Sequence, residues 1–145
     1  NIAMVAYKKI LTRSFFNFKK ERQVAEQYVN DLHIVTPSVD QIAMLLSGGN
    51  QQKVVLAKWL LPDSEIVIFD EPTRGIDVGA KLEIYTIINN LAAAGKTIIV
   101  VSSEMEEVLG ISDRIIVMRE GRVVGELTKD QFSQQAVTEL AIGGV

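Results

Sequence analysis

Two short segments of this sequence carry residue types suited to phosphate and magnesium chemistry. Residues 46–52 read Leu-Ser-Gly-Gly-Asn-Gln-Gln and open a predicted helix. Two glycines let an anion approach the backbone closely, and the free N–H groups of a helix N-terminus attract it. Ser47 adds a hydroxyl donor, so we expect a γ-phosphate to bind here. Taken alone, the same residues also fit a serine that only caps the helix.

The second segment, residues 66–73, reads Ile-Val-Ile-Phe-Asp-Glu-Pro-Thr. Four apolar residues predict a buried strand that presents Asp70 at its carboxyl end, where ligands bind in open α/β sheets. A carboxylate there suits Mg²⁺, which keeps several of its own waters. Glu71 follows directly and is a candidate to orient or deprotonate a water in line with a phosphate. The alternative is an ordinary strand followed by a polar turn.

A lysine-bearing phosphate loop of the form G-x-x-x-x-G-K-[ST] is absent from the 145 residues. That loop normally cradles the β- and γ-phosphates of a bound nucleotide. The sequence also begins at Asn1 rather than Met, so we expect a piece of a longer protein. Taken by itself, the segment is expected to have little or no activity.

Composition and charge narrow the function classes. The net charge of -3 and the sequence pI near 5.2 argue against a nucleic-acid footprint. No apolar run approaches the length that crosses a bilayer. With no cysteines, disulfides and cysteine-based metal or nucleophile chemistry are excluded.

The order of the predicted elements favours an α/β fold built on a parallel sheet with flanking helices. Residues 1–45 are predicted to form a helical front piece, and residues 46–145 an α/β core fragment. Phe15, Phe16 and Phe18 are predicted to be core of the small helical lobe, and Trp59 to pack inside. The predicted elements from residue 66 onward are strand 66–70, helix 78–94, strand 97–101, helix 104–109, strands 114–118 and 122–125, and a final helix over 129–141.

Over about residues 44–126 the motifs resemble those of the ATP-binding-cassette (ABC) ATPases. Residues 46–50 are similar to the family signature, with Asn50 where glutamine is commonest, and residues 66–71 are similar to the Walker B strand. Gly75, Ile76 and Asp77 resemble the D-loop. The Leu-Ser-Gly-Gly-Asn-Gln-Gln-Lys and Glu-Pro-Thr-Arg-Gly-Ile-Asp-Val-Gly-Ala-Lys runs look most like the second, C-terminal cassette of bacterial ribose, galactose and xylose importers.

This resemblance implies a composite ATP site shared by two cassettes. Asp70 would hold Mg²⁺ and Glu71 would serve as the base for ATP bound by the cassette's own upstream phosphate loop. Asp77 would communicate across the interface between the sites. The residues implied to act on ATP held by the partner cassette are Ser47, Gly48, Gly49 and Gln51.

Besides Asn50, a second position departs from the family pattern, and this departure is larger. After the strand 97–101 the family usually has a switch histidine, and here Ser103 aligns with it. Serine cannot supply an imidazole, which puts hydrolysis at this cassette's own site in question. The same substitution resembles the degenerate second cassette of sugar importers. Ser103 as a cap for the helix after it is the other reading.

The resemblance further implies partners and a location. We expect a second cassette, membrane permease subunits, an indirect link to a periplasmic sugar-binding protein, and peripheral attachment at the cytoplasmic face of the bacterial inner membrane. Nucleic acid is not expected. Two alternatives stay open: a non-catalytic cassette that completes a partner's ATP site, and an ABC ATPase that works outside transport.

Overall fold

The computed structural model describes residues 1–6, 10–12 and 15–143. It divides into two compact units, Asn1–Ile99 and Val100–Val145, which are described separately. The predicted boundary between residues 45 and 46 therefore falls inside the first unit, and that subdomain division stays a prediction. Residues 7–9 and 13–14 of the predicted helical piece 1–45 lie outside the described residues.

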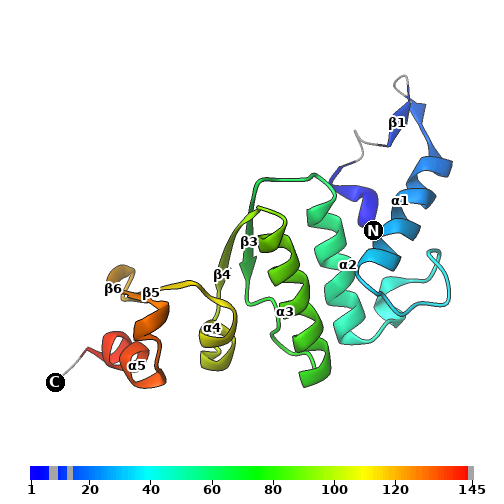
Figure 1. Ribbon diagram of the computed structural model, residues 1–145. Helices are drawn as coiled ribbons and strands as arrows, with labels where there is room; N and C mark the ends of the chain where they lie inside the picture. The colour runs from blue at the N-terminus through cyan, green and yellow to red at the C-terminus, as the bar shows by residue number, and fades with distance from the viewer. Residues whose placement is uncertain (7–9, 13–14, 144–145) are drawn as a thin grey trace. The chain divides into compact units, whose positions relative to one another are not determined.

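The helices of the first unit gather around α2 (Figure 1). This helix contacts η1, α1, η3 and α3. Its buried side is a stripe at helical spacing, formed by Lys53, Leu56, Ala57 and Leu60. The helices formed by the described residues of this unit are η1 (Ile2–Met4), α1 (Phe18–Asp31), η3 (Ala43–Leu45), α2 (Gly48–Leu60) and α3 (Val78–Ala93).

The chain places its chemistry-bearing loop between a strand and a helix. Strand β3 (Ile66–Asp70) ends at the predicted residue, α3 follows as a crossover, and β4 (Thr97–Val101) pairs alongside β3 in parallel. Helix α3 ends as predicted at Gly95, whose positive φ of 88° is one that glycine adopts easily. The strand–helix–strand order of an α/β protein is thus confirmed.

The prediction that four apolar residues bury β3 was wrong for two of them. Val67 and Phe69 are buried, whereas Ile66 and Ile68 are 58% and 65% exposed. Side chains alternate across a strand, and only one face of β3 is packed in the described structure. Ile99 of β4 is also exposed, so this sheet presents an apolar side to solvent.

The aromatic side chains of the front segment also differ from the prediction. Phe15 and Phe18 are 79% and 75% exposed, and Phe16 is exposed as well. Phe15 and Phe16 form β2 (Phe15–Phe16), which pairs with the two-residue β1 (Leu11–Thr12), and this ribbon is too short to enclose a core. Trp59 is exposed because it lies off the buried stripe of α2, beside Lys58.

The second unit contains an antiparallel hairpin that packs against its terminal helix. Glu120 and Gly121 form the two-residue turn, both with positive φ, as type I′ hairpins require. The core of this unit is Ile115, Val117, Leu127 and Val137. Its elements are α4 (Met105–Ile111), β5 (Arg114–Arg119), β6 (Arg122–Thr128), η4 (Lys129–Gln131) and α5 (Gln134–Ile142).

The single helix predicted over residues 129–141 is in fact two. A capping box between Thr128 and Gln131 caps the N-terminus of the short η4, which ends where Phe132 adopts an extended conformation. Ser133 starts α5 anew, because its hydroxyl accepts the backbone N–H of Ala136 at 3.0 Å. Across the described parts of both units, no helix is long and apolar enough to span a membrane.

Candidate functional site

The predicted phosphate-binding loop forms the exposed N-terminal tip of α2. Ser47 is the N-cap residue, but its side chain makes no capping hydrogen bond to the helix backbone. Its hydroxyl oxygen instead accepts the side-chain N–H of Asn50 at 2.8 Å. Ser47 and Gly48 are exposed, and first-turn N–H groups have no partners within a helix. The tip therefore offers a hydroxyl and backbone donors to an anion, as the sequence predicts.

The two glycines at the tip differ in what their missing side chains allow. A Cβ on Gly49 would lie 2.5 Å from the Cβ of Ala80, so this glycine permits α2 and α3 to pack closely. A Cβ on Gly48 would have only the Ile76 side chain nearby, at 3.8 Å. Only Gly48 therefore keeps open the space in front of the tip, whereas Gly49 serves the packing between the helices.

Gln51 and Asn50 hold the segment that leads into the tip. The Gln51 side-chain N–H donates to the carbonyl oxygen of Leu46 at 2.8 Å and lies 3.4 Å from that of Met44. The Asn50 side-chain oxygen accepts the backbone N–H of Val35 at 2.8 Å. These contacts fix the backbone before Ser47; the role of Gln51 as an ATP ligand stays a prediction.

The two carboxylates follow one another where β3 ends. Asp70 is the last, exposed residue of the strand, and Glu71 begins the turn with a positive φ of 48°. A non-glycine residue in this region costs about 1–3 kcal/mol and persists only where its surroundings hold it. Pro72 and Thr73 are fully buried directly after it. The turn is therefore anchored in the core while its two carboxylates remain near the surface.

Asp77 begins the helix that follows this turn. It is the N-cap residue of α3, and its carboxylate accepts the backbone N–H of Ala80 at 3.0 Å. A negative charge at a helix N-terminus is stabilising. Asp77 thus has a structural role that the motif did not predict, and its predicted role between two ATP sites stays a prediction.

Two neighbouring side chains connect these parts, and sequence reasoning missed both. The Gln52 side-chain N–H donates to the carbonyl oxygen of Pro72 at 2.8 Å, which joins α2 to the turn after β3. The buried Lys53 donates to the carbonyl oxygen of His33 at 2.8 Å and forms an ion pair with Glu83 of α3. The helical spacing of Lys53 with Leu56 and Leu60 was the one signal that it faces inward.

Ser103 belongs to the second unit. It is exposed, and the N-cap residue of α4 is Glu104. The Glu104 N–H donates to the hydroxyl oxygen of Ser102 at 3.0 Å. The alternative reading of Ser103 as the cap of this helix was therefore wrong by one position, and its relation to a γ-phosphate stays a prediction.

The donor set suits a magnesium ion held mainly by nucleotide oxygens and water. Among the residues that the structure describes, no group of three or more His, Cys, Asp or Glu side chains could enclose a metal. Mg²⁺ at a phosphate site typically takes one or two carboxylates and keeps several waters. The single exposed carboxylate of Asp70 fits that pattern.

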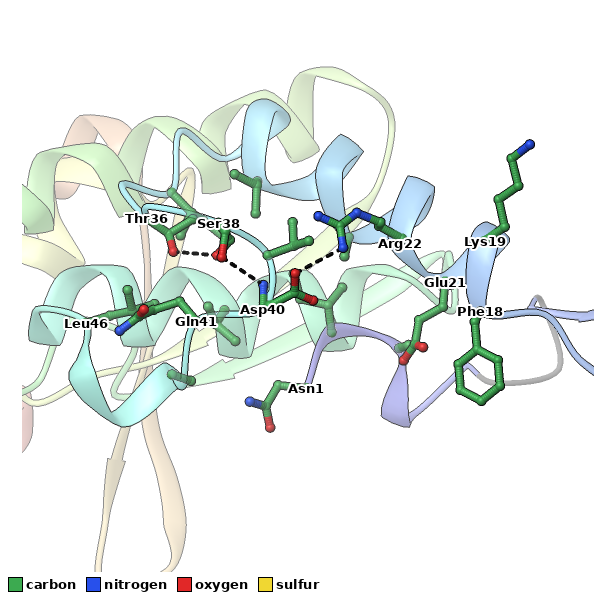
Figure 2. Close-up of a pocket in the computed structure, with 18 residues that line it drawn as sticks. Asn1, Phe18, Lys19, Glu21, Arg22, Thr36, Ser38, Asp40, Gln41 and Leu46 are labelled. Carbon is green, nitrogen blue, oxygen red and sulfur yellow. Dashed lines mark hydrogen bonds and ion pairs between the residues drawn. The ribbon is translucent and has the colours of Figure 1, made fainter.

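A cavity of about 590 Å³ lies elsewhere in the first unit, between α1 and the segment of residues 34–46 (Figure 2). Its lining includes the apolar Val29 and Ile34 and an ion pair of 3.0 Å between Arg22 and Asp40. That hydrogen-bonded ion pair raises the pKa of Arg22 above its ordinary value. None of the predicted site residues lines the cavity, so it is separate from the phosphate site.

A comparison with family profiles identifies the class of protein. The profile described as "ABC transporter" matches residues 2–74, which is half of the chain. The chain belongs to this family, whose ATPase domains bind ATP.

Comparison with curated relatives indicates which ABC transporter proteins this chain is similar to. The ribose import ATP-binding protein RbsA of Clostridium perfringens is 56% identical over 125 residues, which are 86% of this chain and 25% of that protein. A candidate ribose/galactose/methyl galactoside import ATP-binding protein of Halalkalibacterium halodurans is 51% identical over 99% of this chain and 27% of its own length. The chain thus spans about a quarter of the length of these relatives.

Solved structures confirm the fold. A bacterial ABC transporter cassette solved as a dimer is 25% identical, with a TM-score of 0.70 over 83% of this chain and 52% of that one. A nucleotide-free ATP-binding cassette from an ABC transporter gives a TM-score of 0.74 at 21% identity, over 96% and 59% of the two chains. The predicted α/β cassette fold is therefore correct.

Proposed function

We propose that this chain is part of the ATP-binding subunit of a carbohydrate importer, from its second, C-terminal cassette. The longer protein hydrolyses ATP and couples hydrolysis to sugar uptake. The observation that carries the proposal is the exposed Ser-Gly tip of α2 in the same compact unit as the paired carboxylates after β3. Identities of 51–56% to sugar-import ATP-binding proteins support the substrate class.

The tip of α2 acts on ATP bound by a second cassette. The Ser47 hydroxyl and the first-turn N–H groups of α2 donate to the γ-phosphate, where they stabilise negative charge. The open space at Gly48 lets the phosphate reach the backbone. Gln51, four residues after Ser47 on the same helix, also binds the partner's ATP.

The carboxylates serve the nucleotide bound by the cassette's own phosphate loop. Asp70 holds Mg²⁺, which neutralises phosphate charge when bound. Glu71 orients a water in line with the γ-phosphate and accepts its proton. Asp77, next to both the turn and the tip, responds to the partner cassette.

Two substitutions in the full-length protein test these roles separately. Glu71→Gln keeps the shape of the side chain and removes the base, so ATP turnover should fall by about 10²–10⁴-fold while ATP still binds. Ser47→Arg fills the space before the tip and should prevent closure on the partner's ATP. Unaltered turnover in Glu71→Gln would remove Glu71 from the reaction, and unaltered turnover in Ser47→Arg would remove the tip.

Ser103 favours a second candidate, in which this cassette completes a partner's site without hydrolysing ATP itself. Serine at the switch-histidine position lacks an imidazole for the γ-phosphate. Ser103→His in the full-length protein distinguishes the two candidates. A rise in turnover at the site that this cassette binds supports the non-catalytic role, and no change supports hydrolysis without a histidine.

The partners follow from the same proposal. Membrane permease subunits contact the segment of residues 1–45, whose exposed Phe15 and Phe18 would then be covered. A periplasmic sugar-binding protein acts indirectly, through the permease, and the complex holds this chain at the cytoplasmic face of the bacterial inner membrane. The exposed apolar side of β3 and β4 is covered by the upstream part of the cassette. Changing Phe15 and Phe18 to Ser together should weaken co-purification with the permease and leave ATP binding intact.

A further inference from the structure

The hydrogen bond between Gln52 and Pro72 joins the two halves of the candidate site. Gln52 lies on α2, just after the phosphate-binding tip, and its side-chain N–H reaches the carbonyl oxygen of Pro72, 20 residues further along the chain. We propose that Gln52 is a positioning residue for Glu71. The inference rests on the proposed function, in which Glu71 acts on the attacking water.

The backbone around Glu71 shows why such an anchor matters. Glu71 holds a positive φ of 48°, which an unconstrained glutamate would leave for a more favourable conformation. On its carboxyl side the chain enters the core at once, with Pro72 and Thr73 buried. Proline has no N–H, so Pro72 can be tied by a hydrogen bond only through its carbonyl oxygen. Gln52 supplies that bond from a different element.

The position of Gln52 makes the anchor rigid. It lies within a regular helix whose other contacts are fixed by the close approach of Gly49 to Ala80 and by the ion pair of the buried Lys53 with Glu83. The half-buried Gln52 amide, 2.8 Å from the Pro72 carbonyl oxygen, therefore lies on a helix whose position is fixed. A rotation of the turn that carried Glu71 away from the water would have to break this bond.

Isosteric substitution at Gln52 tests the proposal in the full-length protein. Gln52→Glu keeps the size of the side chain but replaces the donor with an oxygen that repels the Pro72 carbonyl. We expect kcat for ATP hydrolysis to fall about 10–100-fold, the loss typical of a reacting group displaced by about 1 Å. KM for ATP should change by less than about twofold, because ATP binding does not involve this bond. Gln52→Lys keeps a donor of similar reach and should retain most of the turnover.

A double substitution separates positioning from a general loss of structure. In a Glu71→Gln background there is no carboxylate to position, so adding Gln52→Glu should lower the residual turnover no further. Gln135→Ala is the matched control, since it removes an exposed side-chain amide bond of 2.7 Å to Glu139 in the second unit. Its kcat should equal that of the unsubstituted protein.

The possible outcomes distinguish a failure of the role of Gln52 from a failure of the proposed function. If Gln52→Glu keeps kcat within about twofold of the parent, or if its loss multiplies with that of Glu71→Gln, Gln52 does not act through Glu71. If Glu71→Gln alone leaves turnover unchanged, the proposed function fails, and the inference fails with it.

Discussion

The contrast between Gly48 and Gly49 gives a prediction that the structure makes quantitative. Both are neighbours in the sequence motif, yet alanine should have opposite effects on stability at the two positions. In Gly49→Ala the new methyl carbon would lie 2.5 Å from the Cβ of Ala80. That separation is roughly 1 Å shorter than the usual 3.5–4.0 Å between carbon atoms, so α2 and α3 must move apart.

The expected magnitude combines two opposing effects. Overpacking of this kind costs about 1–3 kcal/mol. Replacing glycine by alanine in a helix returns about 0.5–1 kcal/mol. Gly49→Ala should therefore destabilise the first unit by roughly 0.5–2 kcal/mol. Gly48→Ala meets only the Ile76 side chain at 3.8 Å, so it should leave stability unchanged or slightly higher.

The chain contains a built-in reporter for this comparison. Trp59 is the only tryptophan, and it lies on α2, so its fluorescence during urea denaturation follows the first unit. Gly49→Ala should unfold at lower urea than the parent, and Gly49→Ala with Ala80→Gly should recover part of the loss. In the full-length protein, Gly48→Ala should lose ATP turnover without losing stability. Equal unfolding midpoints for the two alanine variants would refute the distinction between packing and phosphate access.

Three further predictions concern the contacts around the site and the hairpin. Asp77→Ala should cost about 1 kcal/mol of stability, because it removes the cap of α3. Asp77→Asn keeps the cap and should retain the urea midpoint. If Asp77→Asn nevertheless loses ATP turnover, the negative charge of Asp77 has a role in the reaction. Glu83→Ala leaves the buried ammonium of Lys53 without its carboxylate and should cost about 3 kcal/mol of stability. Lys53→Met should cost less, because it removes the buried charge itself. Equal losses of stability in urea denaturation would contradict this. The Thr128 hydroxyl, 2.7 Å from the Asp130 carboxylate, lowers the pKa of Asp130. The stability that this hydrogen bond contributes is therefore present above the ordinary pKa of aspartate and is lost as pH falls through the lowered pKa. NMR titration of Thr128→Val should show the pKa of Asp130 raised, and an unchanged pKa would contradict the assignment.

Elements whose ends are marked by nearby residues such as proline and glycine could be predicted from the sequence. The strand that ends at Asp70 and the helix that stops before Gly95 were predicted within about one residue, because apolar runs, Pro72 and Gly95 mark their ends. The exposed Ser-Gly tip was predicted for the same reason, since a serine directly before an amphipathic run marks a helix start.

Contacts between distant segments could not be predicted in this way. The bond of Gln52 to Pro72 and the ion pair of Lys53 to Glu83 join residues 20 and more positions apart, and no local pattern encodes such pairs. The buried lysine also concealed the true inner stripe of α2, which made Trp59 look like a core residue. The division of labour between Gly48 and Gly49 depends on Ala80, which lies on another helix.

We propose that the tip of α2 contacts the terminal phosphate of a nucleotide. Hydrogen exchange of the backbone amides in residues 47–50 measures this contact directly, with the Glu71→Gln full-length protein used to keep ATP intact. We expect strong protection of these amides when ATP and Mg²⁺ are added and little when AMP replaces ATP. Equal exchange with and without ATP would contradict it.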